Sequence, residues 1–139
     1  MVDIDSRLVY SSGVTCHSAT YKAAIVNIDR IVKNYMPMTE TAFYILLSLY
    51  EPRHGYGIIR TVEEITKSRI ILGSGTVYGT LTKMQRDGII AVYSNEEHKT
   101  VYEITESGRK LLKLEIERLN ELHRNADELG VRFFGTQIL

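Results

Sequence analysis

The chain has 139 residues with 17 basic and 17 acidic side chains, so its net charge is zero and its length suits one hydrophobic core. Its longest apolar run, residues 42–50, is far shorter than the roughly 20 residues that a membrane-spanning helix needs. The lone Cys16 excludes an internal disulfide, and the acidic start of the chain is unlike a secretory signal peptide. We therefore expect a cytoplasmic protein with no membrane partner.

The neutral total conceals an uneven distribution of charge along the chain. Residues 53–86 carry six basic and two acidic side chains, whereas ten acidic residues outnumber seven basic ones from position 87 onward. A basic middle and an acidic end are compatible with one surface for nucleic acid and another for a partner subunit. Ordinary fluctuation of charge would give a similar pattern, so the distribution alone does not decide whether the chain binds nucleic acid.

Residues 1–35 show no strong periodicity and receive no functional assignment. Residues 21–32 could form an amphipathic helix. The whole segment could equally be a disordered arm, or sequence upstream of a start at Met36 or Met38.

From Pro37 onward the pattern becomes helical. Thr39 is a suitable N-cap for a helix over residues 41–51, whose side chains are apolar almost all round and should be buried. Pro52 should end this helix, because the residue before a proline disfavours helical conformation. The run His-Gly-Tyr-Gly at residues 54–57 predicts a turn. A second helix should follow, with an apolar face made of Ile58, Ile59, Val62 and Ile65.

A third helix should follow the break at residues 73–75, which read Gly-Ser-Gly. Ser74 is the expected N-cap of this helix. Gly88 stands where a left-handed residue usually ends a helix. The apolar residues that should face the core recur at helical spacing: Val77, Leu81 and Met84.

Two strands and a long helix complete the chain. Residues 89–94 and 99–104 are rich in β-branched residues and tyrosine, and residues 95–98 should join them as a hairpin loop. Thr105 should cap a last helix that runs to about residue 129. A narrow apolar stripe on this helix suits a partner helix and predicts a homodimer; it consists of Leu112, Ile116, Leu119, Leu122, Ala126 and Leu129.

The order of elements predicts a mainly α fold with a small β-hairpin, that is, a winged helix-turn-helix with a long C-terminal dimerisation helix. We divide the chain into an N-terminal extension (1–35), a winged-helix DNA-binding domain (36–105) and a dimerisation helix with its tail (106–139).

The side of the third helix opposite its apolar residues has the composition that a DNA groove requires. Glycine allows close approach of the backbone, threonine can meet base edges, and lysine and arginine can meet phosphates or guanine. A solvated helix face is the alternative, but this one has no acid before Asp87 and includes a glycine that weakens the helix. The candidate contacts are Gly75, Thr76, Gly79, Thr82, Lys83 and Arg86, with Ser74 at the start of the helix and Tyr78 at the flank.

Nothing in the sequence indicates an enzyme, a metal site or a cofactor. The glycines of residues 73–79 lack the Gly-Lys-Ser/Thr ending of a phosphate-binding loop. The four histidines (His17, His54, His98 and His123) are scattered, without ligands or catalytic partners at suitable spacing. A winged helix that binds only other proteins is the main alternative function, since a fold does not determine a function.

Several segments, in unbroken order over about residues 36–129, resemble the PadR-type transcriptional regulators. They are Thr39–Leu49, the Pro-Arg-His-Gly-Tyr-Gly of 52–57, the Gly-Ser-Gly-Thr-Val-Tyr-Gly-Thr-Leu of 73–81, 87–90 and 102–108. The resemblance implies a homodimeric repressor that binds a palindromic operator in double-stranded DNA. It also implies a small aromatic inducer that releases the DNA.

By the same resemblance, the contacts on the third helix would be Gly75, Thr76, Tyr78, Gly79, Thr82 and Lys83. Tyr56 and Gly57 would support the second helix beside the DNA backbone. The wing departs from the family, because its tip reads Glu-Glu-His-Lys at 96–99 where several basic residues are usual. Lys99 is therefore the best candidate contact there. The chain also lacks the tryptophan on which drugs stack in some relatives.

Overall fold

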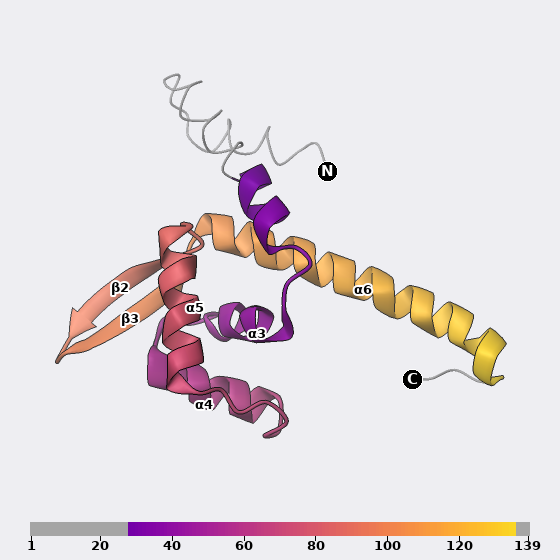
Figure 1. Ribbon diagram of the computed structural model, residues 1–139, viewed down its shortest axis with the longest axis horizontal. Coiled ribbons are helices and arrows are strands. Elements are labelled where there is room, and N and C mark those ends of the chain that lie inside the picture. The colour runs from indigo at the N-terminus through magenta and orange to yellow at the C-terminus, as the bar shows by residue number, and fades with distance from the viewer. Residues whose placement is uncertain (1–27, 136–139) are drawn as a thin grey trace, which may run out of the picture.

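The computed structural model describes residues 28–135 of the chain. In chain order its elements are a helix at residues 28–35, α3 (Glu40–Ser48), β1 (Arg53–His54), α4 (Gly55–Ile65), α5 (Ser74–Arg86), β2 (Ile90–Glu96), β3 (Lys99–Ile104) and α6 (Glu106–Phe134). The short helices and the sheet form one body, and α6 runs along it and projects far beyond it (Figure 1). This arrangement confirms the predicted winged helix with a long C-terminal helix.

Helix α3 lies at the centre of the domain. The Thr39 side chain accepts a hydrogen bond from the Ala42 N–H, which confirms the predicted N-cap. Ile45 and Leu46 in the helix and Leu49 just after it are buried, whereas the other apolar residues of the helix are only half-buried. The helix ends at Ser48, three residues before the predicted end.

The prediction of a turn at residues 54–57 was wrong. Helix α4 already begins at Gly55, because the Nδ1 atom of His54 accepts a hydrogen bond from the Gly57 N–H and so caps the helix. The two preceding residues form strand β1, which pairs antiparallel with β3. The hairpin is therefore part of a three-stranded sheet in the order β1-β3-β2.

Helix α5 is anchored by its inner face, since Val77, Leu81 and Met84 are completely buried, as predicted. The assignment of Ser74 as the N-cap was wrong: Gly73 holds that position without a side-chain bond, and Ser74 is the first helical residue. Gly88 has a φ of 79°, which confirms the left-handed residue expected after this helix.

The hairpin that forms the wing is longer and its turn tighter than predicted. Strand β2 extends to Glu96, so only Glu97 and His98 connect the strands. Both residues have positive φ (47° and 66°), as in a type I′ turn. The register shifts between Val92 and Ser94, which marks a β-bulge.

Helix α6 has 29 residues and continues five residues beyond the predicted end. Thr105 caps it by accepting a bond from the Gly108 N–H, as predicted. Its first turns pack tightly on the domain: Leu111 is fully buried, and a Cβ added at Gly108 would lie 2.1 Å from the carbonyl oxygen of Ile89. The described helices include none that is long and apolar enough to span a membrane.

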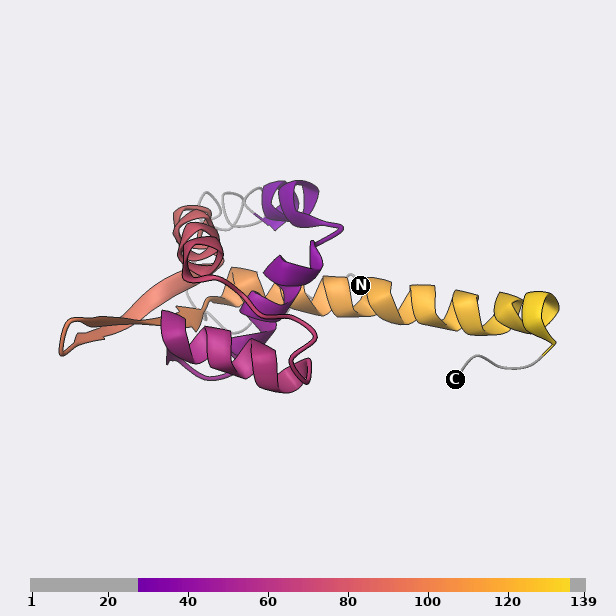
Figure 2. The same cartoon turned by 60° about the horizontal axis from the view of Figure 1, so that its bottom comes forward.

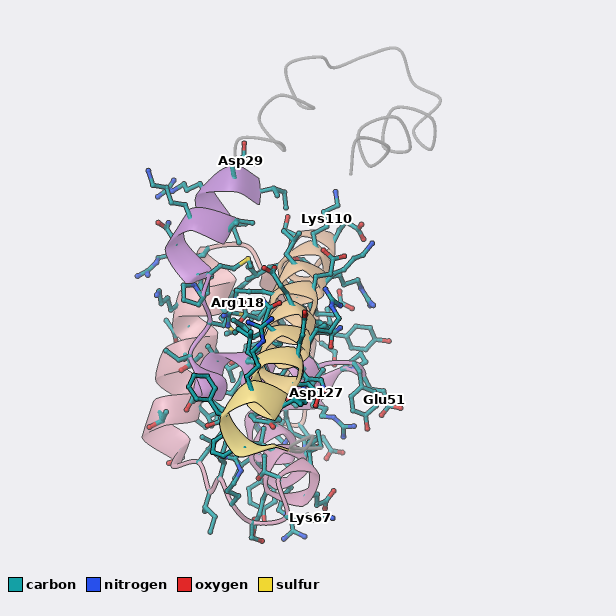
Figure 3. The ribbon with its side chains drawn as sticks, turned by 90° about the vertical axis from the view of Figure 1, so that its right-hand side faces the viewer. Asp29, Glu51, Lys67, Lys110, Arg118 and Asp127 are labelled. Carbon is teal, nitrogen blue, oxygen red and sulfur yellow. The ribbon has the colours of Figure 1, made fainter. Side chains whose placement is uncertain are left out.

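A buried carboxylate fixes the position of α6 farther along. Glu115 is 1% exposed, and its Oε1 accepts a hydrogen bond from the Met38 N–H at 3.2 Å. The Arg118 guanidinium donates two bonds to the same carboxylate, at 2.6 and 2.9 Å, and lowers the pKa of Glu115. Figure 3 looks along α6 and labels Arg118 between this helix and the start of the described chain.

The helix at residues 28–35 belongs to the same folded body. Ile31 is 3% and Tyr35 is 9% exposed, and both join the hydrophobic core. Figure 2 shows this helix, in indigo, beside α5. Residues 1–27, which include most of the segment considered as an amphipathic helix, lie outside the described residues.

Candidate nucleic-acid interface

The residues predicted on the far side of the third helix lie together on one exposed surface, which we call the outer face of α5. An added Cβ at Gly75 or Gly79 would meet no atom within 4 Å, so the backbone is open to a partner at both positions. The face contains no acidic residue. The exposed residues that compose it are Ser74, Gly75, Thr76, Gly79, Thr82, Lys83 and Arg86.

Tyr78 links the outer face of α5 to the beginning of α4. Its side chain is 47% exposed, and an added Cβ at Gly55 would lie only 2.5 Å from its ring. Only glycine at position 55 therefore leaves room for the ring where it stands. The sequence placed Tyr78 at the flank of the helix but gave no indication of this contact.

The hydroxyl groups of the threonines are partly used within α5 itself. The Thr82 Oγ1 atom donates to the Tyr78 carbonyl at 2.8 Å, and that of Thr80 donates to the Thr76 carbonyl at the same distance. The Thr82 methyl group and an oxygen lone pair remain for a partner. Such a side chain suits apolar contact with a thymine methyl or acceptance of a bond from a base.

Lys83 is held at the C-terminal end of α5 by a residue that the sequence left unassigned. Its Nζ lies 4.8 Å from the centre of the Tyr35 ring, a distance suited to a cation–π interaction. The Tyr35 hydroxyl in turn donates to Asp87 Oδ2 at 2.7 Å, and burial together with this bond raises the pKa of Tyr35. Helix 28–35 therefore supports the basic end of the outer face.

The start of α4 presents further exposed aromatic surface near α5. Tyr56 is 60% exposed, and its ring stacks on His54 with 6.4 Å between ring centres. Arg53 is held in place by bonds to the Ser48 carbonyl at 2.9 Å and the Tyr50 hydroxyl at 2.6 Å. These bonds use part of the donor capacity of Arg53 within the chain.

On the wing, Lys99 is exposed, as a contact residue must be. The register pairs it with Glu96 across the turn. Tyr93 is also exposed, at 61%, and stands at the β-bulge. The sequence did not single it out, although a tyrosine within the wing strand was visible.

The predicted dimerisation stripe is largely uncovered in the single chain. The Leu112 end is half-buried, whereas Leu119 is 37% and Leu122 is 50% exposed. The helix also ends in two exposed aromatic residues, Phe133 and Phe134. A groove of about 410 Å³ separates the start of the stripe from α3, and its apolar lining is Leu46, Leu47, Leu49, Tyr50, Ile104, Leu112 and Ile116.

The described part of the chain was searched for clusters of metal-ligating side chains. Over residues 28–135, no group of three or more His, Cys, Asp or Glu side chains is placed to hold a metal ion. Among residues 28–135, the one carboxylate that is almost fully buried is Glu115, which is bonded to Arg118 and the Met38 N–H.

We compared the chain with known families, proteins and structures. The sequence model of one protein family, described as the Transcriptional regulator PadR-like family, matches residues 30–114, which is more than half of the chain. The comparison with curated proteins found no match.

Three solved structures share the fold. A transcriptional regulator from Clostridium thermocellum is 25% identical, with a TM-score of 0.56 over 63% of this chain and 86% of that one. A PadR family regulator from Clostridium difficile R20291 is 21% identical, with a TM-score of 0.55 over 63% and 95%. A protein from Thermoplasma acidophilum assigned as a transcriptional regulator is 31% identical, with a TM-score of 0.52 over 63% and 87%.

Proposed function

Because this chain belongs to the PadR-like family of transcriptional regulators, we propose that it binds double-stranded DNA as a homodimer and represses transcription. The outer face of α5 enters the major groove, and Tyr56 and Lys99 contact the flanking backbone. The protein has no catalytic role in this proposal, and it acts in the cytoplasm.

The observation that carries the proposal is the composition and accessibility of the outer face of α5. An α-helix fits the major groove, and the two open glycines, Gly75 and Gly79, allow its backbone to approach the bases. Lys83 and Arg86 supply positive charge at one end, and the first turn of the helix offers free N–H groups to a phosphate. A surface for another protein would instead carry exposed apolar residues or acids.

The exposed stripe of α6 supports a homodimer. A helix of 29 residues is about 43 Å long, and the small body of the domain covers only its beginning. Pairing with the same helix of a second copy would cover Leu119, Leu122 and Leu129. The two α5 helices would then meet half-sites about one helical turn, roughly 34 Å, apart on a palindromic operator.

The groove between α3 and α6 supports the proposed inducer. Its lining is mainly apolar, and its charged residues are Arg109, Lys113 and Glu117, so two cations against one carboxylate suit a small aromatic acid. A compound bound there would touch Leu112 and Ile116 at the start of the dimerisation stripe. It would release DNA by changing the relation between the two subunits.

The direct test is a mobility-shift titration with a duplex that contains the inverted repeat upstream of the chain's own gene, and with a scrambled duplex. If each subunit neutralises two phosphates with Lys83 and Arg86, the affinity should fall roughly 100-fold between 50 and 200 mM salt. Failure to bind either duplex at 50 mM salt would overturn the proposal and favour a protein-binding winged helix.

A matched pair of variants locates the surface. Lys83→Glu should abolish the shift. Arg124→Glu makes the same change of charge on the side of α6 opposite the stripe and should leave binding intact. Equal loss in both variants would indicate that net charge, and not the outer face of α5, governs binding. Titration with phenolic acids then tests the inducer: an unchanged operator affinity contradicts that part of the proposal.

A further inference from the structure

The C-terminal end of α5 and the helix at residues 28–35 enclose a small depression beside the outer face of α5, with which it shares Arg86. Its volume is about 190 Å³, and two arginines from distant parts of the chain contribute to it. We call it the Arg30–Arg86 depression. It is lined by Arg30, Ile31, Asn34, Tyr35, Arg86 and Asp87.

We propose that the Arg30–Arg86 depression binds a phosphate of the DNA backbone just outside the major groove that α5 occupies. The inference rests on the proposed DNA binding and adds a second element, the helix at residues 28–35, to the contact surface. Two guanidinium groups and the Asn34 amide supply the donors. Arginine binds phosphate strongly because its fork of N–H groups matches the phosphate oxygens.

The dimensions of the groove place a phosphate near this end of the helix. Helix α5 has 13 residues and is therefore about 20 Å long, whereas the major groove of B-DNA is about 12 Å wide. A helix that crosses the groove is longer than the groove is wide, so its ends lie near the phosphate strands on either side. Figures 2 and 3 show helix 28–35 beside that end of α5, on the same side of α6.

The depression is held in shape by contacts that do not involve its arginines. Ile31 and Tyr35 are buried, so the helix that carries Arg30 is fixed to the core. The Tyr35 hydroxyl holds one oxygen of Asp87 at 2.7 Å. A site with rigid walls loses little entropy when a phosphate binds.

Acidic groups near the depression would repel a bound phosphate. The Asp87 carboxylate lies in its wall, 3.5 Å from the Arg86 guanidinium, and is largely occupied by that group and by Tyr35. Asp29 is the other acid of the helix, and Figure 3 labels it at the end farthest from the body of the domain. Arg30, Lys33, Lys83 and Arg86 together outnumber these two carboxylates, so the local field remains attractive to an anion.

The test measures binding of a fluorescein-labelled 30-base-pair duplex of arbitrary sequence by fluorescence anisotropy over a series of salt concentrations. A backbone phosphate contact does not depend on sequence, so no operator is needed. Arg30→Ala should weaken binding roughly 3- to 10-fold and reduce the magnitude of the salt slope by about 0.9 for each subunit bound. Lys33→Ala is the matched control, because it removes the same charge from the same helix outside the depression.

Two further measurements separate a phosphate site from a general effect of charge. If Arg30 and Arg86 hold one phosphate, Arg30→Ala should have a clearly smaller effect in a chain that already carries Arg86→Ala. Arg30→Lys should restore the salt slope. Thermal unfolding of each variant, followed by circular dichroism, should match the unsubstituted protein, because Arg30 is exposed.

The outcomes distinguish this inference from the function on which it rests. If the unsubstituted protein does not bind the duplex at 50 mM salt, the proposed DNA binding fails. If it binds, but Arg30→Ala and Lys33→Ala have equal effects, or the effects of Arg30→Ala and Arg86→Ala are independent, the depression is not a phosphate site and DNA binding through α5 stands.

Discussion

Two helices of this protein present uncovered surfaces of opposite chemistry. The outer face of α5 is polar and basic, and its glycines leave open space above the backbone. The outer half of α6 instead exposes leucines, and it ends in two phenylalanines. The first surface suits a charged, hydrated polymer, whereas the second suits another apolar surface. This difference is what the proposed function requires, with DNA on α5 and a second copy of the chain on α6.

The largest effect should come from making the α6 stripe polar. Leu119→Glu combined with Leu122→Glu should leave the fold intact, because both residues lie beyond the packed part of α6, and should yield a monomer by sedimentation velocity. Operator affinity should fall by about 100-fold or more, since the advantage of two linked half-sites is lost. Glu121→Ala is the control on the opposite side. A variant that remains dimeric would show that α6 does not form the interface.

A single methyl group added at the packed beginning of α6 should destabilise the fold. A Cβ at position 108 would lie 2.1 Å from the Ile89 carbonyl oxygen and 2.8 Å from the Ile104 side chain. Gly108→Ala should therefore lower the free energy of unfolding by about 3 kcal/mol, as overpacking does. Urea denaturation measures the loss. No loss would mean that this junction is looser than its contacts indicate.

The buried carboxylate should make this junction sensitive to acid. The pKa of Glu115 is lowered in the folded state, so its contribution is full above the ordinary carboxyl pKa and disappears as the pH falls through the folded value. Glu115→Gln should cost about 2 kcal/mol at pH 7 and less at pH 3. Urea denaturation at both pH values checks this. An equal cost at the two pH values would contradict the ion pair with Arg118.

On α5, removal of one positive charge should act on DNA binding and not on folding. Lys83→Ala should weaken binding to any duplex by roughly 3- to 10-fold and reduce the salt slope by about one for each subunit. The loss should be the same for specific and scrambled sequences in anisotropy titrations. A loss confined to one sequence would show that Lys83 contacts a base.

The smallest effect separates function from stability on the same face. Gly79→Ala should raise the free energy of unfolding by up to about 1 kcal/mol, because alanine favours the helix and an added Cβ meets no protein atom. DNA binding should weaken at the same time, since the methyl group prevents close approach. Thermal unfolding and anisotropy measure the two effects. Improved stability with unchanged binding would mean that this glycine does not face the groove.

The amphipathic pattern was sufficient to predict most of the fold. Val77, Leu81 and Met84 are buried, and Thr39 and Thr105 cap their helices, because both signals depend only on neighbouring residues. Strand β1 was not predicted, because two residues are too few to show the alternation of apolar and polar side chains that marks a strand. The turn at 97–98 lacks the Asn or Gly that normally marks positive φ, so a longer loop was expected.

The residues of the candidate interface were also visible in the sequence, but their supports were not. The exposure of the outer face of α5 follows from helical geometry. The contact between Tyr78 and Gly55, and the chain from Lys83 through Tyr35 to Asp87, join residues that lie far apart along the sequence. A buried glutamate in α6 runs against the usual preference of charge for the surface, so no pattern indicates it.

The attachment of α6 by Gly108, Leu111 and Glu115 has a geometric consequence for regulation. Because the beginning of the helix cannot turn independently of the domain, the two move as a single stiff arm about 40 Å long. A rotation of about 5° where two such arms cross near their far ends would displace each α5 by roughly 3 Å. In the proposed dimer, a small angular change between subunits would thereby become a mismatch with the spacing of the two half-sites on DNA.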